Sequence, residues 1–240
     1  MSSRNLEYLL APRSVALIGA SDRPNSVGAT VMRNLITGGF DGPVWPVNLR
    51  HERVGRPARV PGVRSLPGVP DLAVVCTPAA AVPGIVAELG EMGTRAAVVI
   101  TAGLDGPAPG GGTLSQAMLD AARPLTLRIL GPNCLGILQP RIGLNASFAH
   151  AQALPGNLAF IAQSGALATA MLDWARTAKI GFSCLVSLGN CAMWISEICS
   201  TISATTLTRE PFCSTSKRSV ARASSCRLPG RRLATSPSLS

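Results

Sequence analysis

The residues between Ser14 and Leu35 have the types and spacing of an anion-binding turn. An apolar run of strand length ends at Gly19, a polar loop follows, and a helix is expected to begin near Ser26. The first N–H groups of a helix have no partner within the helix, and the helix dipole favours negative charge there. Gly19 permits a phosphate to approach the backbone closely, and Gly28 lets helix and ligand lie close because it has no Cβ. The stretch therefore predicts a phosphate cradle; the alternative is a glycine turn that binds nothing.

Short apolar strands alternate with helices around this stretch, which predicts an α/β fold with a Rossmann-like, doubly wound parallel sheet. Strands are expected over 15–18, 43–48, 72–76, 96–100 and 125–130, with helices over 27–36, 80–92 and 114–122. A second βαβ unit is expected over 157–187. The turns that follow the first set of strands all lie at strand carboxyl ends, where such sheets bind ligands.

Composition limits the classes of function. No apolar run approaches the length of a membrane span, and the N-terminal residues lack the apolar core of a signal peptide, so a cytoplasmic protein without a membrane partner is expected. The seven cysteines include no C-x-x-C pair and only His51 and His150 are present, so no metal site is predicted. The net charge of +10 has no basic stripe interleaved with aromatic residues, which argues against nucleic-acid binding.

The kind of nucleotide follows from details of the turns. A dinucleotide-binding unit usually shows G-x-G-x-x-G and an acidic residue that ends the second strand. Here Gly19 and Gly28 are nine residues apart and the second strand ends in Asn48. NAD, and with it an oxidoreductase, is therefore disfavoured.

Four short motifs taken together resemble the NDP-forming acyl-CoA synthetase superfamily, which includes the succinyl-CoA synthetase alpha subunit and ADP-forming acetyl-CoA synthetase. They are Gly19-Ala-Ser21, Pro46-Val-Asn48, Gly131-Pro-Asn-Cys134 and Gln163-Ser-Gly165. The resemblance covers about residues 5–190. It implies a CoA-binding Rossmann-like domain over 1–148 and an incomplete flavodoxin-like domain over 149–190.

The resemblance also implies a ligand and a route for it. Coenzyme A would place its diphosphate on the first turn, its adenosine at the end of the second strand, and its pantetheine along the next two strand ends toward Asn133. The residues assigned to this site are Gly19, Ala20, Ser21, Ser26, Val27, Gly28, Val47, Asn48, Thr77, Pro78, Thr101, Ala102 and Asn133. Gln163, Ser164 and Gly165 would face the phosphorylated species of the second domain. ATP or ADP would act only through an ATP-grasp subunit or domain, which this sequence lacks.

The sequence departs from the superfamily after residue 190. No histidine follows His150 to relay phosphate, so no catalytic residue is assigned and the ligase would be incomplete. Residues 191–240 hold seventeen Ser or Thr and seven Arg or Lys against two acidic residues, without periodicity. A frameshift near residue 192 explains this stretch, since shifting permissible codons by one base restores an acidic amphipathic segment; genomic reads that confirm the present frame would contradict it. We expect residues 150–190 to pack poorly and the tail to be disordered.

Two alternative functions would use the same CoA site. The chain resembles the CoA-binding part of the bacterial protein lysine acetyltransferases that carry a GNAT domain, and it also resembles small CoA-binding modules without catalysis. A downstream reading frame for an ATP-grasp or a GNAT segment distinguishes a synthetase from an acetyltransferase.

Overall fold

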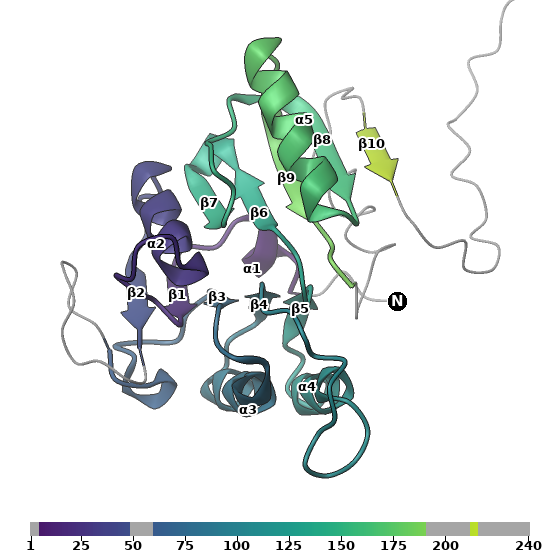
Figure 1. Ribbon diagram of the computed structural model, residues 1–240. Coiled ribbons are helices and arrows are strands. Elements are labelled where there is room, and N and C mark those ends of the chain that lie inside the picture. Colours follow the sequence, from purple (N-terminus) through teal and green to yellow (C-terminus); the bar gives the residue numbers. More distant parts are fainter. Residues whose placement is uncertain (1–4, 49–59, 191–211, 216–240) are drawn as a thin grey trace, which may run out of the picture.

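The computed structural model describes residues 5–48, 60–190 and 212–215, which form two five-stranded sheets with helices on their faces (Figure 1). The first sheet contains β1 (Val15–Ile18), β2 (Val44–Val47), β3 (Leu72–Val75), β4 (Ala96–Val99) and β5 (Arg128–Leu130). Its order is β2-β1-β3-β4-β5 and every pairing in it is parallel. The predicted α/β fold with a parallel sheet is thus confirmed.

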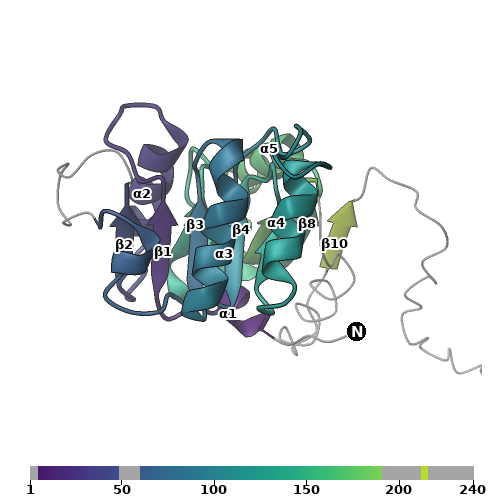
Figure 2. The ribbon, with the colours of Figure 1, turned by 90° about the horizontal axis from the view of Figure 1, so that it is seen from below.

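Both faces of the first sheet are buried, which explains its continuous apolar strands. Alternate residues such as Leu17, Val74 and Val98 face the core shared with the second sheet. The residues that follow them in each strand, among them Ile18 and Val75, pack against α3 (Val82–Met92) and α4 (Leu114–Ala122). Figure 2 shows these two helices side by side over that face. The short α1 (Glu7–Leu10) contributes Leu9 and Leu10 to the shared core.

The second sheet contains β6 (Gly136–Gln139), β7 (Leu144–Ser147), β8 (Pro155–Ala162), β9 (Phe182–Ser187) and β10 (Phe212–Thr215), in the order β10-β8-β9-β6-β7. It is mixed, because β6 runs antiparallel to both β7 and β9 while β8 runs parallel to β9 and β10. The antiparallel pair β6–β7 was not expected from the sequence. The two sheets divide between β5 and β6, ahead of the domain boundary expected at residue 148.

The expectation that residues 150–190 pack poorly is wrong. The helix α5 (Gly165–Thr177) covers the outer face of the second sheet through Ala168, Leu172 and Ala175. Phe160 and Phe182 meet edge to face with ring centroids 6.5 Å apart. In the tail, Phe212–Thr215 form a strand beside β8, contrary to the predicted disorder, and the rest of residues 191–240 lies outside the described residues.

The helix α2 (Val27–Thr37) joins the two sheets, because it follows β1 but packs on β7. Its end comes so close to the β6–β7 turn that a Cβ on Gly38 would lie 2.4 Å from the carbonyl oxygen of Gly143. The start of α2 is therefore fixed relative to both sheets.

Candidate functional site

The predicted cradle is built by a close contact between β1 and α2. Gly19 has a φ of +95°, and a Cβ there would lie 2.7 Å from the carbonyl oxygen of Cys76. A Cβ on Gly28 would lie 2.1 Å from the carbonyl oxygen of Gly19. Gly28 thus serves to pack the helix on the strand end. Ser26 caps the helix by accepting a hydrogen bond from the amide of Ala29 at 3.3 Å, and the amides of Val27 and Gly28 have no partner within the helix.

One part of the predicted cradle is wrong. The amides of Gly19 and Ala20 both donate to the carbonyl oxygen of Val47, at 2.9 and 3.0 Å, so they are not free for a phosphate. The side chain of Asn48 donates to the carbonyl oxygen of Ala20 at 2.9 Å. The end of β2 therefore holds the glycine turn in place, and of the predicted cradle only the amides at the α2 start have no partner within the helix.

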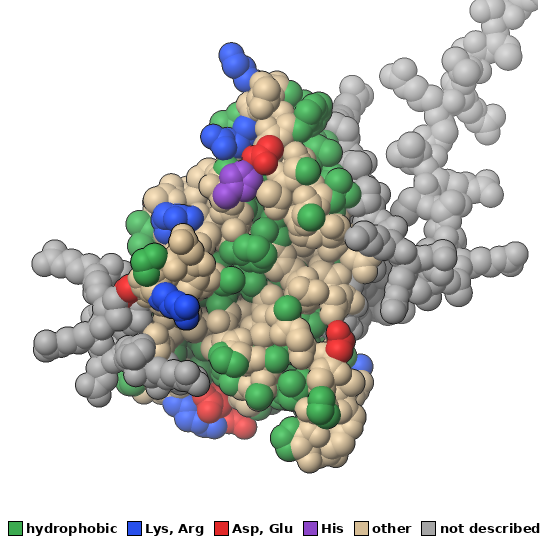
Figure 3. Space-filling view, viewed as in Figure 1, with side chains coloured by type: hydrophobic (Ala, Val, Ile, Leu, Met, Phe, Trp, Pro, Cys, Tyr) green, Lys and Arg blue, Asp and Glu red, His purple; other side chains and the backbone are tan. Residues whose placement is uncertain are grey.

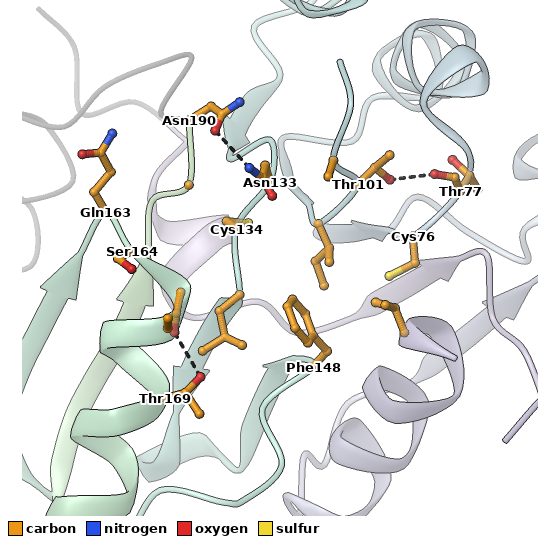
Figure 4. A pocket seen from close by; sticks show the side chains of 17 residues that line it. Cys76, Thr77, Thr101, Asn133, Cys134, Phe148, Gln163, Ser164, Thr169 and Asn190 are labelled. Carbon is orange, nitrogen blue, oxygen red and sulfur yellow. Dashed lines mark hydrogen bonds between the residues drawn. The ribbon is translucent and has the colours of Figure 1, made fainter. Parts of the chain in front are cut away.

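A pocket of about 840 Å³ opens between the carboxyl end of the first sheet and the start of α5 (Figure 4). Half of the predicted site residues line it: Val27, Thr77, Thr101, Ala102, Asn133, Gln163, Ser164 and Gly165. The other predicted residues do not, namely Gly19, Ala20, Ser21, Ser26, Gly28, Val47, Asn48 and Pro78. The pocket lies over β3, β4 and β5, whereas the residues outside its lining belong mainly to the turns after β1 and β2 at the sheet edge.

Polar groups from four chain segments meet at this pocket. The Thr101 hydroxyl donates to the carbonyl oxygen of Thr77 at 2.8 Å, and the amide of Asn133 donates to the carbonyl oxygen of Thr101 at 3.0 Å. The Asn133 side chain donates to Oδ1 of Asn190 at 3.2 Å. Asn133 has a φ of +56°, as expected for an asparagine in a turn, and its side chain also reaches across to the second sheet.

Thr77 is a pocket residue with a buried hydroxyl. It is 9% exposed, and its Oγ1 has no hydrogen-bond partner among the described residues. A buried hydroxyl without a partner costs free energy; Thr94 and Ser183 carry the other two described there, and of the three only Thr77 lines the pocket.

The second helix start at the pocket repeats the arrangement of the first. Ser164 caps α5 by accepting from the amide of Leu167 at 3.4 Å, and the amides of Gly165 and Ala166 have no partner within the helix. The starts of α2 and α5 thus line one pocket with the positive ends of their dipoles. No charged side chain is found among the described residues that line it.

The thiols near the pocket are neutral. Burial raises the pKa of Cys134 from 9.0 to about 12, and burial together with the nearby Cys134 raises the pKa of Cys76. Burial likewise raises the pKa of Cys184 to about 12. These cysteines are therefore packed residues and not nucleophiles at neutral pH.

These shifts predict a loss of stability in alkali. Above pH 9 the unfolded chain releases the Cys134 proton while the folded chain keeps it to about pH 12, so stability falls as pH rises through this window. We expect the urea midpoint to drop between pH 8 and pH 10.5, and to drop less in Cys134→Ala. An equal drop in both proteins would contradict the shift.

Several residues of the pocket were missed by the sequence analysis. Phe148 enters it directly after β7, and Gly189 and Asn190 enter it after β9. Nothing in the local pattern distinguishes Phe148 from a core aromatic. Of the two histidines, His150 lies outside the lining and contacts Asp173 at 2.6 Å, whereas His51 is outside the described residues.

Other kinds of site are not supported within the described residues. No cluster of three or more His, Cys, Asp or Glu side chains there has the arrangement of a metal site. None of the helices described there has the length and apolarity that a membrane crossing requires.

The comparisons with known proteins agree with this geometry. Residues 13–140 match the family of CoA binding domains, and the chain belongs to that family. Residues 155–201 match the succinyl-CoA ligase like flavodoxin domain.

The chain is 40% identical over 190 residues to the alpha subunit of acetate–CoA ligase [ADP-forming] I of Pyrococcus furiosus. That alignment covers 78% of this chain and 41% of the relative. It is 39% identical over 189 residues to acetate–CoA ligase [ADP-forming] I of Archaeoglobus fulgidus, covering 78% of this chain and 27% of that one. A solved structure of acetyl-coenzyme A synthetase 1 of Ca. Korarchaeum cryptofilum, in complex with phosphate and ADP, superposes on this chain with a TM-score of 0.75 and 35% sequence identity. The superposition covers 82% of this chain and 42% of the synthetase chain. The chain therefore spans less than half the length of these relatives.

Proposed function

We propose that the chain binds coenzyme A and its thioesters, as the CoA-binding part of an ADP-forming acyl-CoA ligase of the cytoplasm. The observation that carries this proposal is the combination of an α2 start, where the amides of Val27 and Gly28 have no partner within the helix, and a pocket beside it that mixes apolar residues with polar groups such as Thr101 and Asn133. A diphosphate fits the first and a pantetheine arm, with its two amides, fits the second.

The assignment along the ligand follows the order of the strands. The diphosphate lies at Val27 and Gly28, with Ser21 beside them, and the adenosine lies over the ends of β1 and β2 near Asn48. The pantetheine passes Thr77, Pro78, Thr101 and Ala102, and the thiol ends near Asn133. Gln163, Ser164 and Gly165 at the start of α5 face the phosphorylated species of the ligase reaction.

The remainder of the ligase cycle requires parts beyond this chain's two units, which we assign to 1–148 and 149–190. An ATP-grasp domain or subunit would supply ATP and ADP, and a histidine beyond these units would carry the phosphate. The residues present here bind and orient the thioester.

The unused hydroxyl of Thr77 provides the test. We expect calorimetry to show saturable binding of CoA and no binding of NAD⁺ to the full chain. Thr77→Val keeps the side-chain shape and should weaken CoA binding about tenfold, because it removes one hydrogen bond to the ligand. Thr94→Val is the matched control, since Thr94 Oγ1 is also buried with no partner in the part of the chain that the structure describes, and it lies outside the pocket lining.

Two outcomes contradict the proposal. Binding of NAD⁺ in preference to CoA overturns the ligand class. Equal CoA affinity in Thr77→Val, Thr94→Val and the wild-type chain overturns the route of the pantetheine.

A further inference from the structure

The described residues that line the pocket orient a ligand with neutral hydrogen-bonding groups, because none of them carries a charged side chain. In Figure 3 the described Lys, Arg, Asp and Glu side chains lie around the centre of this face, between α2 and α5, and not in it. A neutral group orients a ligand through the direction of its hydrogen bond. Whatever holds such a group in one direction therefore matters for binding.

Two asparagine side chains of this lining hold one another. The side-chain amide of Asn133, after β5, donates to Oδ1 of Asn190, after β9, at 3.2 Å, and both residues are exposed. A hydrogen bond between exposed groups adds little to stability, because water offers the same kind of partner to each group. The effect of this bond is therefore on direction, since it fixes the plane of the Asn133 amide in the pocket.

The backbone is fixed where the two residues meet. The amide of Asn190 donates to the carbonyl oxygen of Pro132 at 2.8 Å. Gly189 has a φ of +61°, and a Cβ there would collide with the same oxygen. The amide of Gly189 donates to the carbonyl oxygen of Gln163, just before α5, at 3.1 Å. The end of β9 thus lies between the turn after β5 and the start of α5, and these contacts set the position of Asn190.

The bond also determines which atom of Asn133 faces the ligand. Because the nitrogen of its side-chain amide is held toward Asn190, its Oδ1 is turned the other way. Figure 4 shows this oxygen on the side away from Asn190. An amide oxygen accepts hydrogen bonds and does not donate them. The ligand group that meets Asn133 is therefore a donor.

The position of Asn133 places this donor far along the pantetheine arm. The start of α2, where the diphosphate is assigned, packs on Gly19 at the end of β1. Asn133 follows β5, and the order β1-β3-β4-β5 puts three strand spacings, about 14 Å, between these two ends. Figure 4 shows Asn133 and Asn190 on the Gln163 side of the pocket, across from Thr77. The donor of the arm at its far end is the amide N–H beside the thiol.

We propose that Asn190 is a positioning residue, which holds the Asn133 amide so that Oδ1 of Asn133 accepts a hydrogen bond from the amide N–H beside the thiol end of CoA. The thiol is a weaker donor and is absent from a thioester, whereas this N–H is present in both. The inference rests on the proposed function, since it needs CoA in the pocket. It adds to that function a residue of the second sheet that acts on the ligand through Asn133.

The test uses calorimetry on the full chain with CoA, acetyl-CoA and adenosine 3′-phosphate 5′-diphosphate, which is CoA without its pantetheine arm. Asn133→Ala should weaken the binding of CoA and acetyl-CoA about tenfold and Asn190→Ala about fivefold, because each variant loses one oriented hydrogen bond to the ligand. The ligand without the arm should bind both variants as it binds the wild-type chain. In the double variant the loss should equal that of Asn133→Ala alone, since Asn190 acts through Asn133.

Further variants separate positioning from a general effect on the fold. Asn190→Asp keeps an oxygen that accepts from Asn133, so it should retain the CoA affinity within about twofold. Asn157→Ala is the matched control, because Asn157 is also an exposed asparagine that accepts a hydrogen bond, from Arg141 at 2.6 Å, and it lies outside the pocket lining. The urea midpoint of each variant shows whether it folds. Asn190→Leu, which removes the acceptor at a similar side-chain size, replaces Asn190→Ala if that variant does not fold.

The outcomes separate this inference from the proposed function. Additive losses in the double variant would show that Asn190 contacts the ligand itself and would overturn its positioning role. An unchanged CoA affinity in Asn190→Ala, an equal loss for the ligand without the arm, or a loss confined to CoA and absent for acetyl-CoA overturns the inference while CoA binding stands. A wild-type chain that binds neither CoA nor acetyl-CoA overturns both.

Discussion

Gly28→Val is expected to abolish CoA binding and to lower the free energy of unfolding by about 3 kcal/mol. A Cβ at this position would lie 2.1 Å from the carbonyl oxygen of Gly19 and 3.3 Å from the amide nitrogen of Ser21. Both are backbone atoms, so no side-chain rotation relieves the clash, and α2 must move away from β1. That movement displaces the two outward amides at the helix start and uncovers Val31 and Leu35, which are fully buried. Urea unfolding and calorimetry with CoA measure the two effects.

Gly84→Ala separates this effect from the general effect of replacing a helical glycine. Gly84 lies in α3, and a Cβ there meets nothing within 4 Å. Alanine should therefore stabilise the chain by about 0.5–1 kcal/mol through its better helix propensity. If Gly28→Val retained the wild-type midpoint and CoA affinity, the close contact between helix and strand would not be what forms the cradle.

The elements around the cradle could be predicted because their signals are local. Three signals lie close together in the sequence: the apolar run at Val15–Ile18, the glycine after it and the capping serine at position 26. They indicate a strand, a turn and a helix start, respectively. The same holds for α3, with its proline in the first turn and Gly93 at its end in the left-handed region. Local signals therefore predicted the first sheet and its order of strands and helices.

The contacts of the turn could not be predicted, because they depend on the registration of strands. The carbonyl oxygen of Val47 accepts from the amides of Gly19 and Ala20 only because β2 lies beside β1 with Ile18 opposite Val47. A sequence pattern identifies a glycine turn without showing which of its amides a neighbouring strand will use. The sequence thus predicted the glycine turn, while two of the amides expected to face a phosphate donate to β2 instead.

The hairpin β6–β7 was missed for a different reason. Each strand has four residues, and three of the four residues between them form a 3-10 turn that ends at Gly143. A proline and a glycine between two short apolar runs are a hairpin signal, and this signal was present. Phe148 follows that hairpin, so its place in the pocket lining depends on the second sheet.

Asn34→Leu is expected to cost about 3 kcal/mol and to loosen the pocket, although Asn34 lies outside its lining. Asn34 is 4% exposed, and its amide donates to two carbonyl oxygens, of Ser147 and Ala149, that lie 113 and 115 residues away. Leucine leaves both carbonyl groups buried without that donor, and each such loss costs about 1–3 kcal/mol. Urea unfolding should show the loss of stability.

The same variant links the two halves of the site, because the backbone that Asn34 holds is the backbone that presents Phe148. Asn34→Leu should therefore also weaken CoA binding in calorimetry, because Phe148 lines the pocket in which the pantetheine is proposed to lie. Asn157→Leu is the control, since Asn157 is exposed and its side chain accepts a surface hydrogen bond from Arg141 at 2.6 Å. A stable Asn34→Leu protein with the wild-type CoA affinity would show that the hydrogen bonds across the two sheets do not shape the pocket. A destabilised protein that keeps the wild-type affinity would confine Asn34 to a role in packing.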